Sequence, residues 1–153
     1  MNSGLCEFIK QDSAKESKIM STLMIVEDHL IFRRMLSKLF QEWFPSLHIV
    51  EAGDVPEALH FAAAHAPEVI LMDIHLPSGS GLDATLRIKE DLPGTTVIVC
   101  TSENCAMYRK AALESGASHF ITKSELSVGD SRSVIEAAFA AAGVCGPGPG
   151  QES

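Results

Sequence analysis

Several polar residues that could do chemistry together each end a short apolar run. An aspartate, Asp73, closes the run VILMD, and the acids Glu27 and Asp28 close TLMIVED. A hydroxyl, Thr101, and an amine, Lys123, end or follow two further runs. Carboxylates, a hydroxyl and an ammonium group are the side chains that bind a divalent cation and a phosphate group side by side. The residue types therefore indicate phosphoryl-transfer chemistry.

The three carboxylates favour a particular metal and a particular nucleophile. Carboxylates close together raise one another's pKa by repulsion unless a cation joins them. A few hard oxygen ligands that leave room for water and a phosphate favour Mg²⁺ over zinc. Lys123 can neutralise an anion bound beside the metal, and the Thr101 hydroxyl can donate to it. Because carboxylates form aspartyl-phosphates, Asp73 is the candidate nucleophile.

The elements that must position these residues alternate along the chain. Between five short runs rich in β-branched residues lie longer segments with apolar residues at helical spacing. The runs are TLMIVE (22–27), LHIVEA (47–52), EVILMD (68–73), TTVIVCT (95–101) and SHFIT (118–122). Their lack of apolar–polar alternation predicts parallel strands covered on both faces. The pattern predicts an α/β fold, a (βα)5 doubly wound, five-stranded parallel sheet with a closing helix at about 131–142.

Such a sheet binds ligands at the carboxyl ends of its strands. If the first, third, fourth and fifth strands are central, the polar residues that end them meet at one edge. Pro77 and the glycines Gly79 and Gly81 are expected to turn the chain after Asp73 and to let the backbone lie close to the site. Asp54 is expected to cap the helix after the second strand. Arg33 and Arg34 are expected on a solvated helix face.

Length and composition indicate one domain. At 153 residues, the chain is long enough for one hydrophobic core and short for two. We expect a flexible extension at 1–20, the domain at 21–143, and a flexible Gly/Pro-rich tail at 144–153. A formal charge of -8 argues against direct binding of nucleic acid or anionic lipid.

The cellular setting follows from what the sequence contains. Without a signal-peptide pattern or an apolar stretch of membrane-spanning length, we expect a cytoplasmic protein with no membrane association. The cysteines Cys6, Cys100, Cys105 and Cys145 show no metal-ligand spacing and are expected as reduced thiols.

The motifs resemble a known family. The acidic pair ED at 27–28, MDIHLPSGSG around Asp73, VIVCTS with Thr101, and GASHFITK ending in Lys123 are similar to the CheY-like receiver domain of two-component response regulators. The likeness covers about residues 22–142, and EDHLIFRRML is closest in style to LuxR- and NarL-type receivers. It implies a flavodoxin-like sheet of strand order 2-1-3-4-5.

The resemblance also implies roles for single residues. Asp73 would be phosphorylated by a sensor histidine kinase or a phosphotransfer protein, and Lys123 would contact the phosphoryl group. Thr101 and Phe120 would be a switch pair, although Phe120 lacks the hydroxyl of the tyrosine frequent there. The Mg²⁺ ligands would be Glu27, Asp28, Asp73 and the backbone carbonyl of His75.

The same family implies a signalling domain rather than an enzyme. It would catalyse only its own phosphorylation and dephosphorylation. The surface at 104–142 would change in response and contact a downstream protein partner or a second copy of the chain. Ser124 departs from the family pattern, in which a proline often follows the lysine.

Plainer interpretations remain open for each residue. Glu27 and Asp28 could only cap the first helix, Lys123 could be a surface lysine, and Thr101 and Phe120 could be core residues. The whole domain could be an interaction module that works without phosphorylation. A phosphohydrolase or nucleotide-binding domain is disfavoured because no GxxxxGK[ST], GxGxxG or serine nucleophile-elbow motif is present.

Overall fold

The computed structural model describes residues 21–127 and 132–142. The predicted extension at 1–20 and the tail at 144–153 lie outside these residues. Within the described part, no helix combines the length and the apolar character needed to cross a membrane.

Five parallel strands form the central sheet, in the order β2-β1-β3-β6-β7. They are β1 (Thr22–Val26), β2 (His48–Ala52), β3 (Val69–Met72), β6 (Thr96–Thr101) and β7 (His119–Thr122). Each lies within one of the five runs identified in the sequence. Counted in chain order, these strands have the order 2-1-3-4-5, so the predicted flavodoxin-like topology is confirmed.

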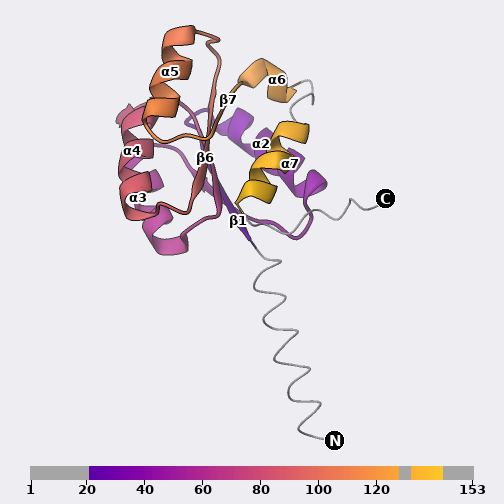
Figure 1. The fold of residues 1–153 in the computed structure, drawn as a ribbon. Helices are drawn as coiled ribbons and strands as arrows, with labels where there is room; N and C mark the ends of the chain where they lie inside the picture. The colour runs from indigo at the N-terminus through magenta and orange to yellow at the C-terminus, as the bar shows by residue number, and fades with distance from the viewer. Residues whose placement is uncertain (1–20, 128–131, 143–153) are drawn as a thin grey trace, which may run out of the picture.

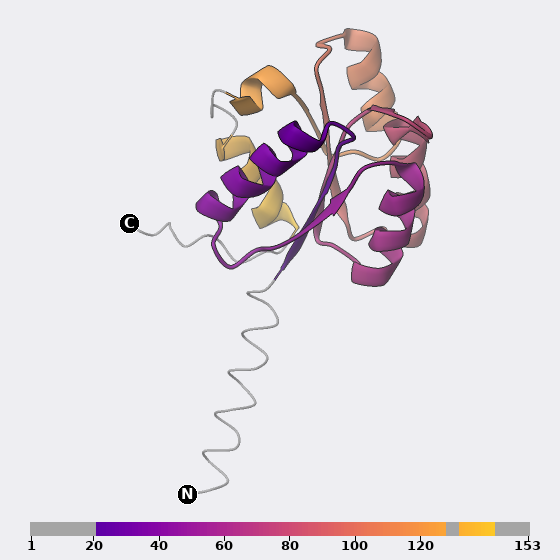
Figure 2. The ribbon, with the colours of Figure 1, turned by 180° about the vertical axis from the view of Figure 1, so that it is seen from behind.

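Helices cover both faces of this sheet (Figures 1 and 2). The longer helices are α2 (Leu30–Trp43), α3 (Val55–His65), α4 (Gly81–Asp91), α5 (Ala106–Glu114) and α7 (Arg132–Ala141). In both views α2 and α7 lie on one side, and α3, α4 and α5 lie on the other. This arrangement confirms the doubly wound architecture.

Side-chain alternation along the strands builds two cores from one sheet. In β1, Leu23 and Ile25 pack in the core under α2 and α7, where Phe40 and Phe139 also lie. The intervening Met24 and Val26 pack in the other core with residues of α3, α4 and α5. Because successive strand residues point to opposite faces, a strand between two helical layers must be apolar throughout. That is why the sequence shows unbroken apolar runs.

Two short elements were not predicted from the sequence. A hairpin of β4 (His75–Leu76) and β5 (Gly79–Ser80) turns the chain back at Pro77. A five-residue helix, α6 (Lys123–Ser127), starts directly after β7. Both follow strands at the carboxyl edge of the sheet and therefore shape the candidate site.

Candidate functional site

The predicted site residues follow neighbouring strands at the carboxyl edge of the sheet. Asp73 follows β3, while Glu27 and Asp28 follow β1, which is hydrogen-bonded to β3. Thr101 ends β6, and Lys123 follows β7 as the first residue of α6. Strand order alone thus brings together groups that are far apart in the sequence.

The carboxylates of Glu27, Asp28 and Asp73 form one cluster. Each offers an oxygen, and the three oxygens lie within 4.8 Å of one another. Glu27 and Asp73 are buried, whereas Asp28 is exposed to solvent. Three oxygen donors with one open side fit a hard divalent cation that keeps some of its water, which is the coordination that Mg²⁺ prefers.

Lys123 supplies the positive charge in this cluster. Its Nζ lies 2.8 Å from Glu27 Oε1 and 3.2 Å from Asp73 Oδ2. Burial alone would lower the pKa of the Lys123 ammonium, but hydrogen bonds and charges from Glu27 and Asp73 outweigh it and raise that pKa. Lys123 is therefore a protonated group held between two buried carboxylates, and not an ordinary surface lysine.

The carboxyl group of Asp73 has a raised pKa. Burial, reinforced by the charge of Glu27, raises the pKa of Asp73 from 3.8 to about 6, although Lys123 and the backbone N–H of His75 act in the opposite direction. Ionisation of Asp73 is thus costly in the folded protein. A divalent cation or a further positive charge nearby would stabilise the ionised carboxylate.

This raised pKa predicts how stability depends on pH. Between about pH 4 and pH 6 the folded protein holds a proton on Asp73 that the unfolded chain has released. Protonation of Asp73 therefore adds to the free energy of unfolding, fully below pH 4, and this contribution is lost as the pH rises through 6. The loss in the free energy of unfolding is roughly 3 kcal/mol in total, at 1.36 kcal/mol for each unit of pKa shift.

Urea unfolding of the wild-type protein and of Asp73→Asn, in chelator at pH 4, 5, 6 and 7, would measure this. Asparagine cannot ionise, while every other carboxyl group titrates in both proteins. The free energy of unfolding of Asp73→Asn, minus that of the wild type, should increase steadily from pH 4 to pH 6 and then stay constant. A constant difference across the range would show that burial does not perturb Asp73.

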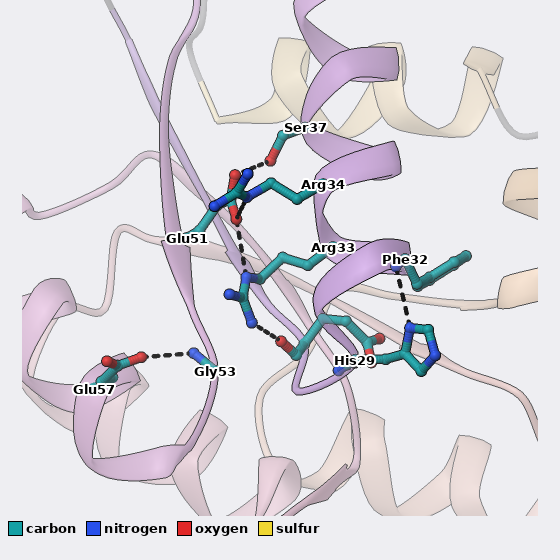
Figure 3. Close-up of polar contacts among 9 residues, drawn as sticks. His29, Phe32, Arg33, Arg34, Ser37, Glu51, Gly53 and Glu57 are labelled. Atoms are coloured by element: carbon teal, nitrogen blue, oxygen red, sulfur yellow. Dashed lines mark hydrogen bonds and ion pairs between the residues drawn. The ribbon is translucent and has the colours of Figure 1, made fainter.

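The first helix does not use the acidic pair as its cap. The cap of α2 is His29, whose Nδ1 accepts a hydrogen bond from the backbone N–H of Phe32 at 3.2 Å (Figure 3). Glu27 instead accepts from the backbone N–H of His29 at 3.0 Å and pairs with Lys123. The capping interpretation of Glu27 and Asp28 is therefore wrong. The predicted cap of α3 by Asp54 is confirmed.

The loop after Asp73 comes very close to it at Gly81. The N–H of Gly81 donates to the carbonyl of Ile74 at 2.8 Å. A Cβ added to Gly81 would lie 1.8 Å from the backbone oxygen of Asp73. The predicted close approach of backbone at this glycine is thus observed.

The backbone of His75 contacts Asp73, whereas its imidazole ring contacts other residues. The backbone N–H of His75 donates to the Asp73 carboxylate. The imidazole Nε2 lies 3.6 Å from Glu103 Oε1, and the ring meets that of Tyr108 edge-on at 5.5 Å. The His75 side chain therefore joins the loop after β6 instead of the carboxylate cluster.

Thr101 and Phe120 lie on the neighbouring strands β6 and β7, where Thr101 pairs with Thr122 and Phe120 pairs with Val99. Thr101 is fully buried, and its hydroxyl has no hydrogen-bond partner among residues 21–127 and 132–142. Phe120 is 8% exposed, and the Arg109 guanidinium carbon lies 4.7 Å from its ring centroid. A buried hydroxyl without a partner is costly, and an acceptor entering the site would relieve that cost.

Sequence reasoning missed one polar residue near the site. Arg33 was expected on a solvated face, but its side chain is only 16% exposed and contacts Glu51 and the backbone of Glu27. Arg34, the next residue, is 70% exposed, as expected. Helical spacing could have suggested the difference, because Arg33 lies near the strand-facing side with Leu36 and Phe40.

Known proteins resemble this chain over most of the described residues. The sequence-family model of the response regulator receiver domain matches residues 23–129. Chemotaxis protein CheY of Halobacterium salinarum is 33% identical over 101 residues, which are 66% of this chain and 82% of that protein. The glycerol metabolism activator of Pseudomonas putida is 28% identical over 106 residues, 69% of this chain and 48% of the activator.

Solved structures give the same result. The crystal structure of a LuxR-family two-component response regulator from Aurantimonas sp. SI85-9A1 has a TM-score of 0.70 and 29% identity, and the match covers 87% of this chain and 94% of that one. The chain spans about half the length of several of the curated relatives that it matches.

Proposed function

The chain belongs to the response regulator receiver domain family, and on that premise we propose that it accepts a phosphoryl group on Asp73 and passes the signal on through a changed surface. The observation that carries the proposal is the carboxylate cluster itself. Asp73 lies with two further carboxylates within 4.8 Å and with the Lys123 ammonium 3.2 Å away. The family acts in two-component signalling, so the donor is a sensor histidine kinase or a phosphotransfer protein.

The transfer needs no other nucleophile. A carboxylate oxygen of Asp73 forms a bond to phosphorus while the phosphorus–nitrogen bond of the donor phosphohistidine breaks. The bonding pair leaves with the imidazole, which takes up a proton from solvent. Hydrolysis later returns the carboxylate and inorganic phosphate. In this sense the domain catalyses only its own phosphorylation and dephosphorylation.

The acidic residues fit Mg²⁺ as the cofactor. Glu27, Asp28, Asp73 and the backbone carbonyl of His75 would hold it, which accords with hard oxygen donors and one exposed side. When bound, the ion supplies positive charge to the phosphoryl oxygens. Lys123 adds a second positive charge, and the Thr101 hydroxyl donates to a phosphoryl oxygen.

The same residues suggest how phosphorylation changes the surface. A phosphoryl group carries about -1.5 to -2 charge and three acceptor oxygens. The unpartnered Thr101 hydroxyl would turn toward them, and Phe120 would move into the space released. The helices α5 and α7, which flank β7, form the surface that would then change and contact a downstream protein or a second copy of the chain.

Other aspects of the function belong to the same proposal. The net charge of -8 favours protein partners over direct nucleic-acid binding, and we propose a cytoplasmic location. An interaction module that works without phosphorylation is not favoured. Such a module would have no use for three clustered carboxylates, which repel one another, beside a half-buried lysine.

Beryllofluoride, which binds aspartate as a phosphoryl mimic, tests the proposal. Backbone NMR of the wild-type protein with Mg²⁺ and beryllofluoride should show shifts around Asp73 and also along residues 104–123. Asp73→Asn should show neither. Shifts confined to the metal ligands would contradict the switch, and equal shifts in Asp73→Asn would contradict the choice of nucleophile.

A further inference from the structure

Arg33 joins the carboxyl ends of two strands from its place on α2 (Figure 3). Its Nη1 donates to the backbone carbonyl oxygen of Glu27 at 2.6 Å. Its Nε donates to Glu51 Oε1 at 2.9 Å. Glu27 follows β1 and Glu51 lies in β2, so one guanidinium group holds both strand ends to the first helix.

The carbonyl of Glu27 is a critical point of attachment. It belongs to the planar peptide unit that joins Glu27 to Asp28, so a hydrogen bond to it fixes the orientation of that whole unit. Asp28 lies outside any helix or strand and is exposed, so its own side chain offers little packing to hold it. Fixing the peptide between them therefore fixes the direction in which both carboxylates leave the backbone.

Glu51 in turn keeps the Arg33 side chain in place. Its Oε2 accepts from the Ser37 hydroxyl at 2.8 Å, and Arg34 Nε lies 3.5 Å from its Oε1. Burial opposes ionisation of Glu51, but hydrogen bonds from Arg33 and Ser37, with the charges of Arg33 and Arg34, outweigh burial and lower the pKa of Glu51. Arg33 thus binds a carboxylate that stays charged at neutral pH.

Gly53 leaves the space that the guanidinium group occupies. A Cβ at this position would lie 3.1 Å from Arg33 Nη1, which is tighter than an ordinary contact. The chain turns away just there, since Gly53 N–H donates to Glu57 Oε1 at 2.7 Å (Figure 3). The absence of a side chain at Gly53 therefore lets the Arg33 guanidinium group reach the backbone carbonyl of Glu27.

We propose that Arg33 is a positioning residue for Mg²⁺, acting through the Glu27 carbonyl to hold the carboxylates of Glu27 and Asp28 in the arrangement that binds the ion. The inference rests on the proposed function. It assigns to Arg33 a role without contact to the metal. Groups that orient metal ligands in this way typically affect metal affinity about 10- to 100-fold.

The sign of the effect separates positioning from simple electrostatics. Arg33 is positively charged and lies near the carboxylates, so removing its charge would by Coulomb repulsion alone tighten Mg²⁺ binding. Loss of positioning would weaken binding instead. Arg34→Gln is the matched control, because this substitution also removes one positive charge next to Glu51. The Arg34 side chain contacts Glu51, whereas the hydrogen bond to the Glu27 carbonyl comes from Arg33.

Isothermal titration with Mg²⁺ of the full chain should give the following result. Arg33→Gln binds Mg²⁺ at least about tenfold more weakly than the wild type, and Arg34→Gln binds it equally well or slightly better. Arg33→Lys, whose single ammonium cannot reach both partners as a fork, falls in between. Asp28→Ala, which removes a ligand, marks the affinity expected for a broken site.

Two further readouts exclude a general loss of structure. In metal-free protein, the carbonyl carbon-13 shift of Glu27 and the amide of Asp28 should move in Arg33→Gln and not in Arg34→Gln. The rate of labelling of Arg33→Gln by acetyl phosphate should return to the wild-type rate at saturating Mg²⁺. A protein with a disordered site would be labelled slowly by acetyl phosphate at any Mg²⁺ concentration.

Three outcomes would overturn the inference. Unchanged or tighter Mg²⁺ binding by Arg33→Gln, with the wild type and Asp28→Ala as expected, would remove the role of Arg33 and leave the proposed function standing. Full recovery in Arg33→Lys would show that the two-partner contact of the guanidinium group with Glu27 and Glu51 is not what positions the carboxylates. If the wild type itself bound no Mg²⁺, both this inference and the proposed function would fail.

Discussion

Replacement of Gly81 with alanine is expected to destabilise the protein by more than about 3 kcal/mol and to abolish phosphoryl acceptance. The added Cβ would lie 1.8 Å from the Asp73 carbonyl oxygen and 2.8 Å from its carbonyl carbon. Both are backbone atoms at the end of a buried central strand, so they cannot yield as a flexible side chain would. Overpacking in a core costs 1–3 kcal/mol and more when backbone must shift.

The control for this substitution is Gly94→Ala. A Cβ at Gly94 would meet nothing within 4 Å, so its free energy of unfolding should stay within about 0.5 kcal/mol of the wild type. Urea unfolding and labelling by acetyl phosphate would be measured on all three proteins. Wild-type stability and labelling in Gly81→Ala would show that helix α4 does not approach Asp73 as closely as described.

Replacement of Lys123 with alanine is expected to have the next largest effect. Without Lys123, the buried carboxylates of Glu27 and Asp73 lose their counter-charge, and breaking such a buried pair costs about 3 kcal/mol. The loss should be greatest in chelator at pH 7 to 8. It should shrink near pH 4, where Asp73 with its raised pKa is protonated, and also on addition of Mg²⁺, which replaces the missing positive charge.

Lys110→Ala serves as the control, because Lys110 is an exposed lysine on α5. Its stability should match the wild type at every pH and Mg²⁺ concentration. A loss in Lys123→Ala that did not respond to pH or to Mg²⁺ would mean that lost packing of the lysine stem, and not charge, explains it. The electrostatic account of the site would then be wrong.

The arrangement of the main strands and helices could be predicted from the sequence for a clear physical reason. Strands buried on both faces must be apolar throughout, and TTVIVCT therefore identified β6 within one residue. A parallel sheet then places every strand-end polar group at the same edge. Asp73, Thr101 and Lys123 could accordingly be assigned to one site before their distances were known.

What escaped prediction depended on short segments and on tertiary contacts. The two-residue strands β4 and β5 and the five-residue helix α6 are too short to show a period. Helical spacing places Arg33 on the same face as Leu36 and Phe40, but its contact with Glu51, in another element, cannot be deduced from that spacing. The raised pKa of Asp73 likewise requires knowledge of its burial beside Glu27.

The most direct test of the central claim is the intact mass of the chain after incubation with acetyl phosphate and Mg²⁺. The wild-type protein should gain the mass of one phosphoryl group, and Asp73→Asn should gain none, because an amide is not a nucleophile of comparable strength. Chelation of the metal should suppress the gain. An equal gain in Asp73→Asn, or no gain in the wild-type protein with Mg²⁺ present, would contradict the assignment of Asp73 as the phosphoacceptor.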